Sequence, residues 1–322
     1  MKRKAAFFAA ALVLASLSFV SMAAHAADKV RVAKAVGSQP VYTVLDVGIE
    51  QGIFAKYGID VEISTMTGEA RMQQALTAGS LDIGMAGSSG AALSAKGAPV
   101  IAIAVFLNAP ANFAVVVLND SPIKKVADLK GKSLSGATTG GLPEWLVKHL
   151  AVTQGWGPEG IRSVSVGSPD ASVSALRTRQ VDGMMTGNTT GFTLEAQGIA
   201  HIVVHVGDYA KDYHSALVFA RKDFIAQSPD VTERYLKGMF ATVAFMRANK
   251  AKSVEIASKV MHLDPAILDR VYDLEVGAFS SDGHFDPKAV ELVKQSFIEM
   301  GSLTEKPRDD QILTTKFVPV KF

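Results

Sequence analysis

Hydrophobic and polar residues follow two different periods along the first third of the chain. In some stretches every second residue is apolar, which predicts half-buried strands, and in others apolar residues recur three or four positions apart, as on one face of a helix. Strands that alternate with helices favour a mainly parallel sheet with helical crossover connections. The predicted strands cover 29–36, 59–65, 81–86 and 99–106, and the predicted helices 42–54, 69–78 and 91–96.

The same order of elements returns in the middle of the chain. The segment "ALTAGSLDIGMAGSSG" at 75–90 aligns without a gap with "ALRTRQVDGMMTGNTT" at 175–190, and both end in a stretch predicted to be a loop, GSSG or GNTT. Chance similarity is the alternative, but the match continues to Gly97 and Gly198, and a strand follows each. We therefore predict two α/β lobes of one design. The strands of the second lobe are predicted at 132–137, 161–166, 181–186 and 201–206.

The last third of the chain is predicted to be helical. Ser228, Asp264 and Asp286 each precede a proline, so each can cap a helix whose first position suits proline. The first of these helices has an apolar face that must pack on something. No low-complexity linker separates this tail from the lobes, and we expect it to wrap back onto one of them.

Composition and charge narrow the classes of partner. A chain of 322 residues with 48% hydrophobic residues can bury a sizeable core, and its length favours two lobes. Residues 1–26 resemble a secretory signal cleaved after Ala26: basic residues, an apolar run and a small-residue site. An uncleaved anchor is the alternative, but the apolar run is shorter than the roughly 20 residues that a spanning helix needs.

Cleavage would change the balance of charge. The precursor has a formal net charge of +2, and loss of its three basic residues at 2–4 leaves 30 basic against 31 acidic residues. A nearly neutral protein argues against nucleic acid or anionic lipid as partner. The chain has no cysteine, hence neither disulfides nor a thiol for lipid attachment. We expect a protein that diffuses freely in a periplasm.

The candidate ligand-binding residues lie in small polar loops after the predicted strands. In open α/β sheets, ligands bind beyond the carboxyl ends of the strands, where helices begin with free N–H groups. For each loop the alternative is that it only turns the chain and caps a helix. The candidates are Ser38, Gln39, Tyr42, Gly68, Glu69, Ser88 and Ser89 in the first lobe, and Thr138, Thr139, Gly140, Asp170, Asn188 and Thr189 in the second.

Patterns that would indicate an enzyme are incomplete. Gly131 to Ser133 reads like the end of a phosphate-binding loop, but the required earlier glycine is Val126. His201 and His205 share a strand face, yet no third metal ligand accompanies them, so a packed or solvated pair is favoured. Trp145 is expected in a core, with contact to the ligand as the alternative. We predict no catalytic residue, metal ion or cofactor.

Three stretches, "VGIEQGIFAKYGIDVEI", "ALTAGSLDIGMAG" and "DSPIKKVADLKGKSL", resemble the periplasmic substrate-binding proteins of ABC importers for sulfonates, taurine, nitrate and thiamine precursors. The resemblance implies the type II two-lobed fold, with a ligand cleft between lobes and the C-terminal helices packed on the first lobe. It places the crossings near Asn112 and Leu217, and so divides the mature chain into 27–112 plus 217–322 and 113–216.

The resemblance also implies a function. The chain would be a monomer that closes over a small organic anion or heterocycle, of sulfonate, carboxylate or pyrimidine type, and delivers it to the importer's membrane permease. Gly187-Asn188-Thr189 stands where the sulfonate-binding branch often has an aromatic, an acid and a proline, which weakens the case for a sulfonate. The alternative is an enzyme of the same fold, such as a thiamine-precursor synthase.

Overall fold

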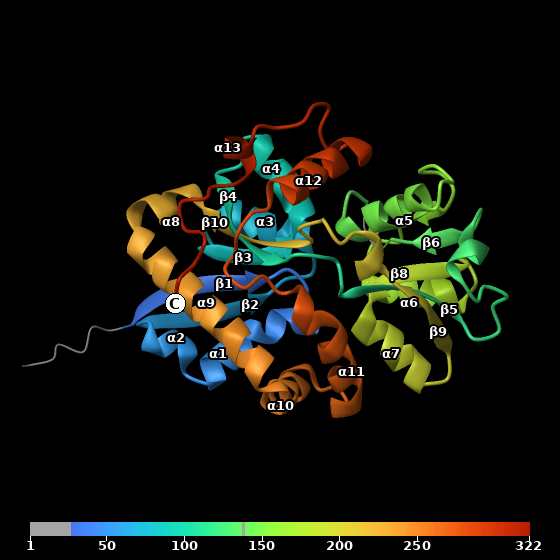
Figure 1. Ribbon diagram of the computed structural model, residues 1–322, viewed down its shortest axis with the longest axis horizontal. Coiled ribbons are helices and arrows are strands. Elements are labelled where there is room, and N and C mark those ends of the chain that lie inside the picture. The colour runs from blue at the N-terminus through green and yellow to red at the C-terminus, as the bar shows by residue number, and fades with distance from the viewer. Residues whose placement is uncertain (1–26, 137–138) are drawn as a thin grey trace, which may run out of the picture.

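Two mixed sheets, each with helices on both faces, form the two lobes of the protein (Figure 1). The computed structural model describes residues 27–136 and 139–322. The predicted signal peptide at 1–26 and the candidate residue Thr138 lie outside the described residues. The α/β, two-lobed fold class is confirmed. In the described part of the chain, no helix is both long and apolar enough to cross a membrane.

The first lobe is built on five strands in the order β2-β1-β3-β10-β4. In β1, valines alternate with more polar residues, as the sequence pattern predicted. Val30 and Val32 are therefore fully buried in the core of this lobe. The strands are β1 Asp28–Lys34, β2 Ile59–Thr65, β3 Ile83–Gly87, β4 Val100–Leu107 and β10 Ala216–Arg221.

The second lobe repeats this order, with strands β7-β6-β8-β5-β9. Its core contains Val116, Leu176 and Met184. Met184 lies in a predicted strand, whereas Val116 lies in β5, a strand that was not predicted. The strands are β5 Phe113–Leu118, β6 Ser133–Ser135, β7 Arg162–Val164, β8 Gly183–Gly187 and β9 Ala200–His205.

One strand in each sheet runs antiparallel to its neighbours, and in both lobes it is the strand that follows a crossing. The chain leaves β4 through 108–112 to enter β5, and leaves β9 through 206–215 to enter β10. The chain enters each new sheet at the edge where the other strands end, so the strand that follows the crossing runs antiparallel to them. The lobe boundaries drawn from the resemblance stay a prediction, but these segments lie at or beside Asn112 and Leu217.

The helices that cover the two sheets follow the predicted spacing with two corrections. The helix predicted over 42–54 is two helices, because Gly52 takes a left-handed conformation with φ of 63° between them. The stretch GNTT was predicted to be a loop, but a helix already begins at Asn188. These helices are α1 Val44–Glu50, α2 Ile53–Lys56, α3 Glu69–Thr77, α4 Ala91–Ala95, α5 Leu142–Thr153, α6 Pro169–Arg177 and α7 Asn188–Ala196.

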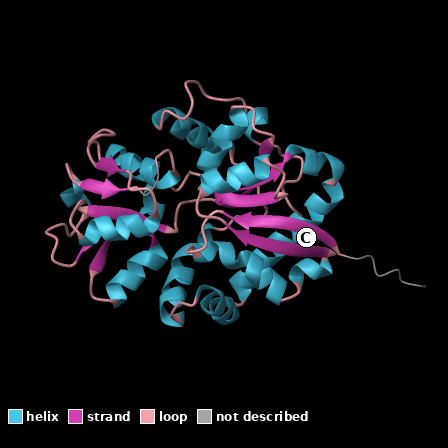
Figure 2. Ribbon diagram, turned by 180° about the vertical axis from the view of Figure 1, so that it is seen from behind, coloured by secondary structure: helices cyan, strands magenta, loops and turns pink. Residues whose placement is uncertain are grey.

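The C-terminal helices pack on the first lobe, as expected, and Figure 2 shows them from behind. Tyr235, Met239 and Phe240 of α9 are fully buried in the core that this helix shares with the first sheet. The six helices are α8 Lys222–Gln227, α9 Pro229–Ala248, α10 Lys250–Met261, α11 Pro265–Glu275, α12 Pro287–Glu299 and α13 Asp309–Ile312. Short 3-10 turns are η1 Pro40–Thr43, η2 Ser88–Gly90, η3 Val126–Leu129, η4 Val206–Tyr209 and η5 Val276–Ala278.

Two of the three predicted helix caps are confirmed. The Asp264 carboxylate accepts a hydrogen bond from the N–H of Ala266, and Asp286 accepts two in the first turn of α12. Ser228 was predicted to cap α9, but its side chain makes no such bond. The reason is that Ser228 also ends α8, so its backbone is not in the extended conformation of a capping residue.

Candidate site at the interlobe junction

The carboxyl ends of both sheets meet where the chain passes between the lobes. Ala216, the first residue of β10, pairs with Gly87 at the end of β3, and Phe113 of β5 pairs with Gly187 at the end of β8. The Ser215 hydroxyl donates a 2.8 Å hydrogen bond to the Ala109 carbonyl, which ties one crossing segment to the other. We call this region the interlobe junction; it comprises 35–39, 67–69, 87–89, 108–112, 206–215 and the start of α7 (Figure 1).

Gln39 reaches from the first lobe to the first crossing segment. Its Oε1 accepts a 2.9 Å hydrogen bond from Nδ2 of Asn112, and its Cγ would lie 3.8 Å from a Cβ on Gly187. Asn112 and Thr189 are 4% and 5% exposed, yet Asn112 Oδ1 and Thr189 Oγ1 have no hydrogen-bond partner among the described residues. His214 Nδ1, in the second crossing segment, is a third such atom at the junction. A buried polar atom without a partner is costly, so these atoms call for a further partner.

Asn188, the first residue of α7, is fully buried and all of its polar side-chain atoms are used. Its Nδ2 donates to the Ala111 carbonyl at 2.7 Å and to Glu275 Oε1 at 3.1 Å. Its Oδ1 must then accept from Nδ1 of His205, at 2.9 Å. Its backbone N–H donates to the Asn112 carbonyl at 3.0 Å. Asn188 thus holds the first crossing segment and joins it to α11.

Ser88 occupies the equivalent place in the first lobe and is also fully buried. Its backbone N–H donates to the Ser215 carbonyl at 3.1 Å, so it holds the second crossing segment. Its hydroxyl donates to the Tyr213 hydroxyl at 2.8 Å, which lies 3.2 Å from Ser296 Oγ of α12. The prediction that Ser88 and Asn188 bind the ligand stays untested, but both side chains already have protein partners.

Glu69 and Ser89 lie together at the end of β3. The Glu69 carboxylate accepts a hydrogen bond from the Ser89 hydroxyl and sits against Gly87, where a Cβ would come within 2.1 Å of Glu69 Oε1. Only glycine leaves room for the carboxylate at that position. Burial raises the pKa of Glu69 above its ordinary value, although the bonds to Ser89 and Gly87 oppose the shift.

Glu275, the last residue of α11, contacts the junction through Asn188, and the sequence reasoning missed it. It is 3% exposed, and burial raises its pKa to about 8, with the hydrogen bond from Asn188 opposing the shift. The signal that could have found it is its place in the chain: with Leu268 and Val271 it falls on the buried face of α11. A glutamate within an apolar stripe indicates a buried, paired carboxyl.

The other candidate residues are placed in different surroundings. Tyr42 is 4% exposed and stacks on Phe106, with ring centroids 6.0 Å apart, inside the core of the first lobe. Ser38 is exposed, and Gly68 directly precedes α3 with a φ of 130°. The second-lobe candidates make local contacts. Thr139 Oγ1 donates a hydrogen bond to Ser165 Oγ at 2.8 Å, and the N–H of Gly140 donates one to Glu144 Oε2 at 2.7 Å. Asp170 is exposed in the first turn of α6. None of these three hydrogen-bonds to Gln39, Glu69 or Asn188 in the described part of the chain.

Trp145 and the two histidines of β9 have structural roles. Trp145 is fully buried, stacks on Tyr213 at 4.2 Å, and donates through Nε1 to Glu299 at 2.7 Å, which confirms the core interpretation. His201 hydrogen-bonds to the Ile123 carbonyl, whereas His205 bonds to Asn188. Within the residues that the structure describes, no group of three or more metal-ligating side chains occurs.

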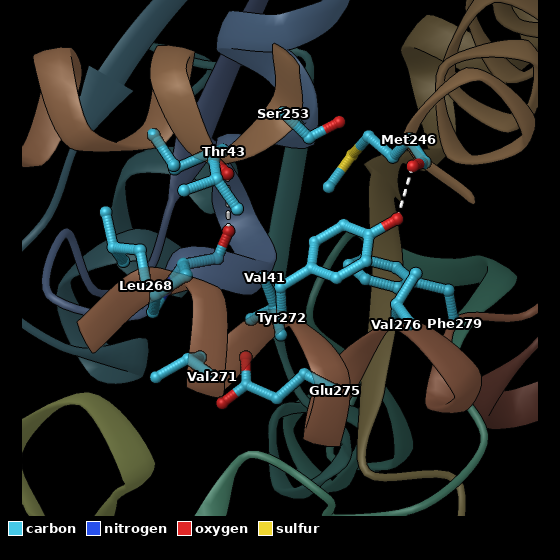
Figure 3. Close-up of a pocket in the computed structure, with 13 residues that line it drawn as sticks. Val41, Thr43, Met246, Ser253, Leu268, Val271, Tyr272, Glu275, Val276 and Phe279 are labelled. Carbon is cyan, nitrogen blue, oxygen red and sulfur yellow. Dashed lines mark hydrogen bonds between the residues drawn. The ribbon is translucent and has the colours of Figure 1, made fainter. Parts of the chain in front are cut away.

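A small cavity lies away from the junction, between η1 and the helices α9, α10 and α11 (Figure 3). Its volume is about 30 Å³, about the share of one water molecule in the liquid. Leu268, Val271 and Phe279 line it, and the Tyr272 hydroxyl at its edge donates to the Met246 carbonyl (Figure 3). The cavity is too small for an organic solute.

Comparison with known proteins decides the family. Residues 39–253 match the model of the family described as NMT1/THI5 like. The chain belongs to this family. The NMT1/THI5-like match covers both crossing segments and most of both lobes, and it confirms the predicted resemblance.

Relatives of this NMT1/THI5-like chain are named binding proteins. A binding protein of Brucella abortus strain 2308 is 26% identical over 276 residues, which cover 84% of this chain and 82% of the relative. The binding protein YtlA of Bacillus subtilis strain 168 is 23% identical over 283 residues, 85% of this chain and 84% of the relative.

Solved structures share the fold of this NMT1/THI5-like chain at low sequence identity. The periplasmic aliphatic sulphonate binding protein SsuA of Escherichia coli superposes with a TM-score of 0.74 at 19% identity, over 89% of this chain and 92% of that one. The periplasmic nitrate-binding protein NrtA of Synechocystis PCC 6803 gives a TM-score of 0.70 at 16% identity, over 90% and 86%. The fold is therefore that of the periplasmic binding proteins.

Proposed function

We propose that the protein is the solute-binding component of an ABC importer, which captures a small organic solute at the interlobe junction and delivers it to a membrane permease. The observation that carries the proposal is that two buried atoms at the junction, Asn112 Oδ1 and Thr189 Oγ1, have no partner among the described residues. A solute held there would supply the missing hydrogen bonds. The names of the relatives, and those of the solved structures with this fold, support the same function.

The proposal assigns different tasks to the predicted site residues. Gln39, Glu69, Ser89 and Thr189 contact the solute, whereas Ser88 and Asn188 hold the crossing segments. The lobes, 27–112 plus 217–322 and 113–216, close by rotation about these two segments. The protein works as a monomer in the periplasm after loss of residues 1–26. The relatives' names favour binding over the alternative of an enzyme of this fold.

Native mass spectrometry of the protein purified from the periplasm of its own host tests the function. The expected spectrum contains a complex with one small organic molecule, which gentle collisional activation releases intact. Adding the released compound in hundredfold excess over its dissociation constant should stabilise the fold by about 2.7 kcal/mol. A spectrum of free protein only, or conversion of the compound to a product, would contradict the proposal.

A further inference from the structure

In the described part of the chain, two of the C-terminal helices contact helices of the second lobe. α11 packs against α7, and α12 is hydrogen-bonded to α5. In the view of Figure 1, α12 lies above the crossing segments and α11 below them. Both helices belong to the part of the chain that packs on the first lobe, so each contact fixes one lobe against the other.

The contact between α12 and α5 is buried at the second crossing segment. Trp145 of α5 is fully buried and donates through Nε1 to Glu299 of α12 at 2.7 Å. Its ring stacks at 4.2 Å on Tyr213, which is itself part of the second crossing segment. Because the lobes would rotate about the crossing segments, little movement is expected at this contact.

The contact between α11 and α7 runs along one face of α7. Asn188, Phe192 and Glu195 stand four and three positions apart, so they share that face. At one end, Asn188 donates to Glu275 of α11 at 3.1 Å. At the other end, the guanidinium of Arg270, also of α11, lies 3.8 Å from the centre of the Phe192 ring and pairs with Glu195 at 3.0 Å. The α11 helix therefore holds this face of α7 at both ends.

The two ends of this contact differ in exposure and in distance from the crossing segments. Asn188, bonded to the first crossing segment, is fully buried, whereas the side chains of Arg270 and Glu195 are 53% and 26% exposed. The helical rise of 1.5 Å per residue places Glu195 roughly 10 Å from Asn188 along α7. A lobe rotation of about 15° would move an atom at that distance by roughly 2.5 Å. Such a movement breaks the Arg270 ion pair and leaves Asn188 nearly in place.

We propose, on the basis of the lobe rotation in the proposed function, that Arg270 latches the lobes and that they separate when its side chain leaves Phe192 and Glu195. The buried contacts of Asn188 and Trp145 remain in place as the pivot. An exposed ion pair and a cation over an aromatic ring are each weak, so the latch biases the arrangement of the lobes without fixing it. Its removal should raise the population of separated lobes, relative to latched ones, roughly tenfold.

The distance between the lobes, measured by pulsed electron paramagnetic resonance on the protein without solute, tests the latch. The chain has no cysteine, so spin labels attach only where cysteines are introduced. Ala251→Cys on α10 and Gln180→Cys before β8 are exposed positions on the first and second lobes.

In this doubly labelled protein, Arg270→Ala should raise the ratio of long to short distances roughly tenfold. Arg270→Glu should raise it further, because the new carboxylate repels Glu195. Unchanged distances in both variants would overturn the latch. They would leave the solute-binding function standing, since the mass spectrum of the purified protein tests that function separately.

Arg308 provides the matched control. It is an exposed arginine that pairs at 3.0 Å with Asp310, two residues further along the C-terminal segment. Arg308→Ala and Arg308→Glu remove or reverse the same charge without touching α7, so their distances should match those of the protein with Arg308 intact. A shift as large as that of the Arg270 variants would show a general effect of charge and would contradict the latch.

Salt gives a readout with Arg270 unaltered, should its variants fail to fold. The screening length falls from about 10 Å at 0.1 M salt to about 3 Å at 1 M, which weakens an exposed ion pair. Potassium chloride at 1 M should therefore move the labelled protein towards the longer distance, and should have less effect on Arg270→Ala. No response with Arg270 intact, or an equal response in Arg270→Ala, would contradict the proposal.

Discussion

The two copies of the repeated segment put different residues to the same structural task. In the first lobe Ser88 bonds through its backbone to the second crossing segment, and in the second lobe Asn188 bonds in the same way to the first. Each copy thus secures the segment along which the chain enters its sheet. The repeat builds a symmetrical pair of anchors at the interlobe junction.

The side chains of the two anchors, Ser88 and Asn188, differ in the number of hydrogen bonds they make. The Ser88 hydroxyl adds one bond to a pair, Tyr213 and Ser296, that remains bonded without it. The Asn188 amide serves three partners: Ala111, His205 and Glu275. The comparison teaches that equal position in a repeat fixes the backbone contact, while the surrounding helices α11 and α12 decide the role of the side chain.

The largest effect on stability should come from removing the side chain of Asn188, the anchor with more hydrogen bonds. Asn188→Ala leaves three partners without their bonds, the buried Glu275 among them, and should lower the free energy of unfolding by about 3 kcal/mol, against about 1 kcal/mol for Ser88→Ala. Urea unfolding at pH 7 measures both values. Equal losses of unfolding free energy would contradict the larger structural role of the Asn188 side chain. A large loss of solute affinity in folded Ser88→Ala would show that Ser88 contacts the solute.

The glycines before the two anchors offer a matched comparison with a smaller effect. A methyl group at Gly87 would lie 2.1 Å from Glu69 Oε1, whereas at Gly187 its nearest neighbour would be 3.7 Å away. Both glycines have negative φ, so strain of the backbone is not involved. Gly87→Ala should cost about 1 kcal/mol, because the end of the Glu69 side chain must move and lose its hydrogen bond with Ser89, and Gly187→Ala less than about 0.5 kcal/mol. Thermal unfolding of the two variants checks the difference, and similar melting temperatures would refute the placement of Glu69.

The dependence of stability on pH sharpens the role of Glu275, the partner of Asn188. The folded protein holds a proton on Glu275 up to about pH 8, whereas the unfolded chain releases it near the ordinary value of 4.5. This contribution to stability is therefore fully present below pH 4.5 and is lost as pH rises through about 8. Relative to Glu275→Gln, the wild type should lose up to about 1.4 kcal/mol per pH unit in this window.

Unfolding in urea at pH 5, 6, 7 and 8 measures the effect, with Glu62→Gln as the control for loss of an exposed carboxyl. The control should follow the wild type across the range. Parallel curves for the wild type and Glu275→Gln would show that Glu275 titrates normally.

Local patterns predicted much of the fold because each element carries its own period. The alternation in β1 and β2 and the prolines that begin α11 and α12 are visible within a few residues of sequence. The repeated segment at 75–90 and 175–190 also predicts the two lobes. The 3-10 turn at Ser88 and the helix starting at Asn188 were harder to separate, because both follow a strand and a glycine.

The candidate site was predicted only in part because its contacts join distant segments. Gln39 meets Asn112 across 73 residues, and Asn188 meets Glu275 across 87. Alignment of the two copies shows only that Ser88 and Asn188 occupy the same position in the repeat. It does not show their partners on α11 and α12, so the sequence predicted that both residues bind the ligand. Thr139, Gly140 and Asp170 follow strands as a ligand site requires. Thr139 and Gly140 hydrogen-bond to Ser165 and Glu144 of the same lobe, and Asp170 is exposed in the first turn of α6.

The affinity of Thr189→Ala for the solute that co-purifies with the protein tests the central claim most directly. Thr189 Oγ1 is buried beside the anchor Asn188 and has no protein partner, so its loss should not lower the free energy of unfolding. Thr153→Ala, at the far end of α5, serves as the control. The account predicts that calorimetry will show a dissociation constant raised roughly 2- to 13-fold in Thr189→Ala and unchanged in Thr153→Ala. Unchanged affinity in both variants would contradict binding at the interlobe junction.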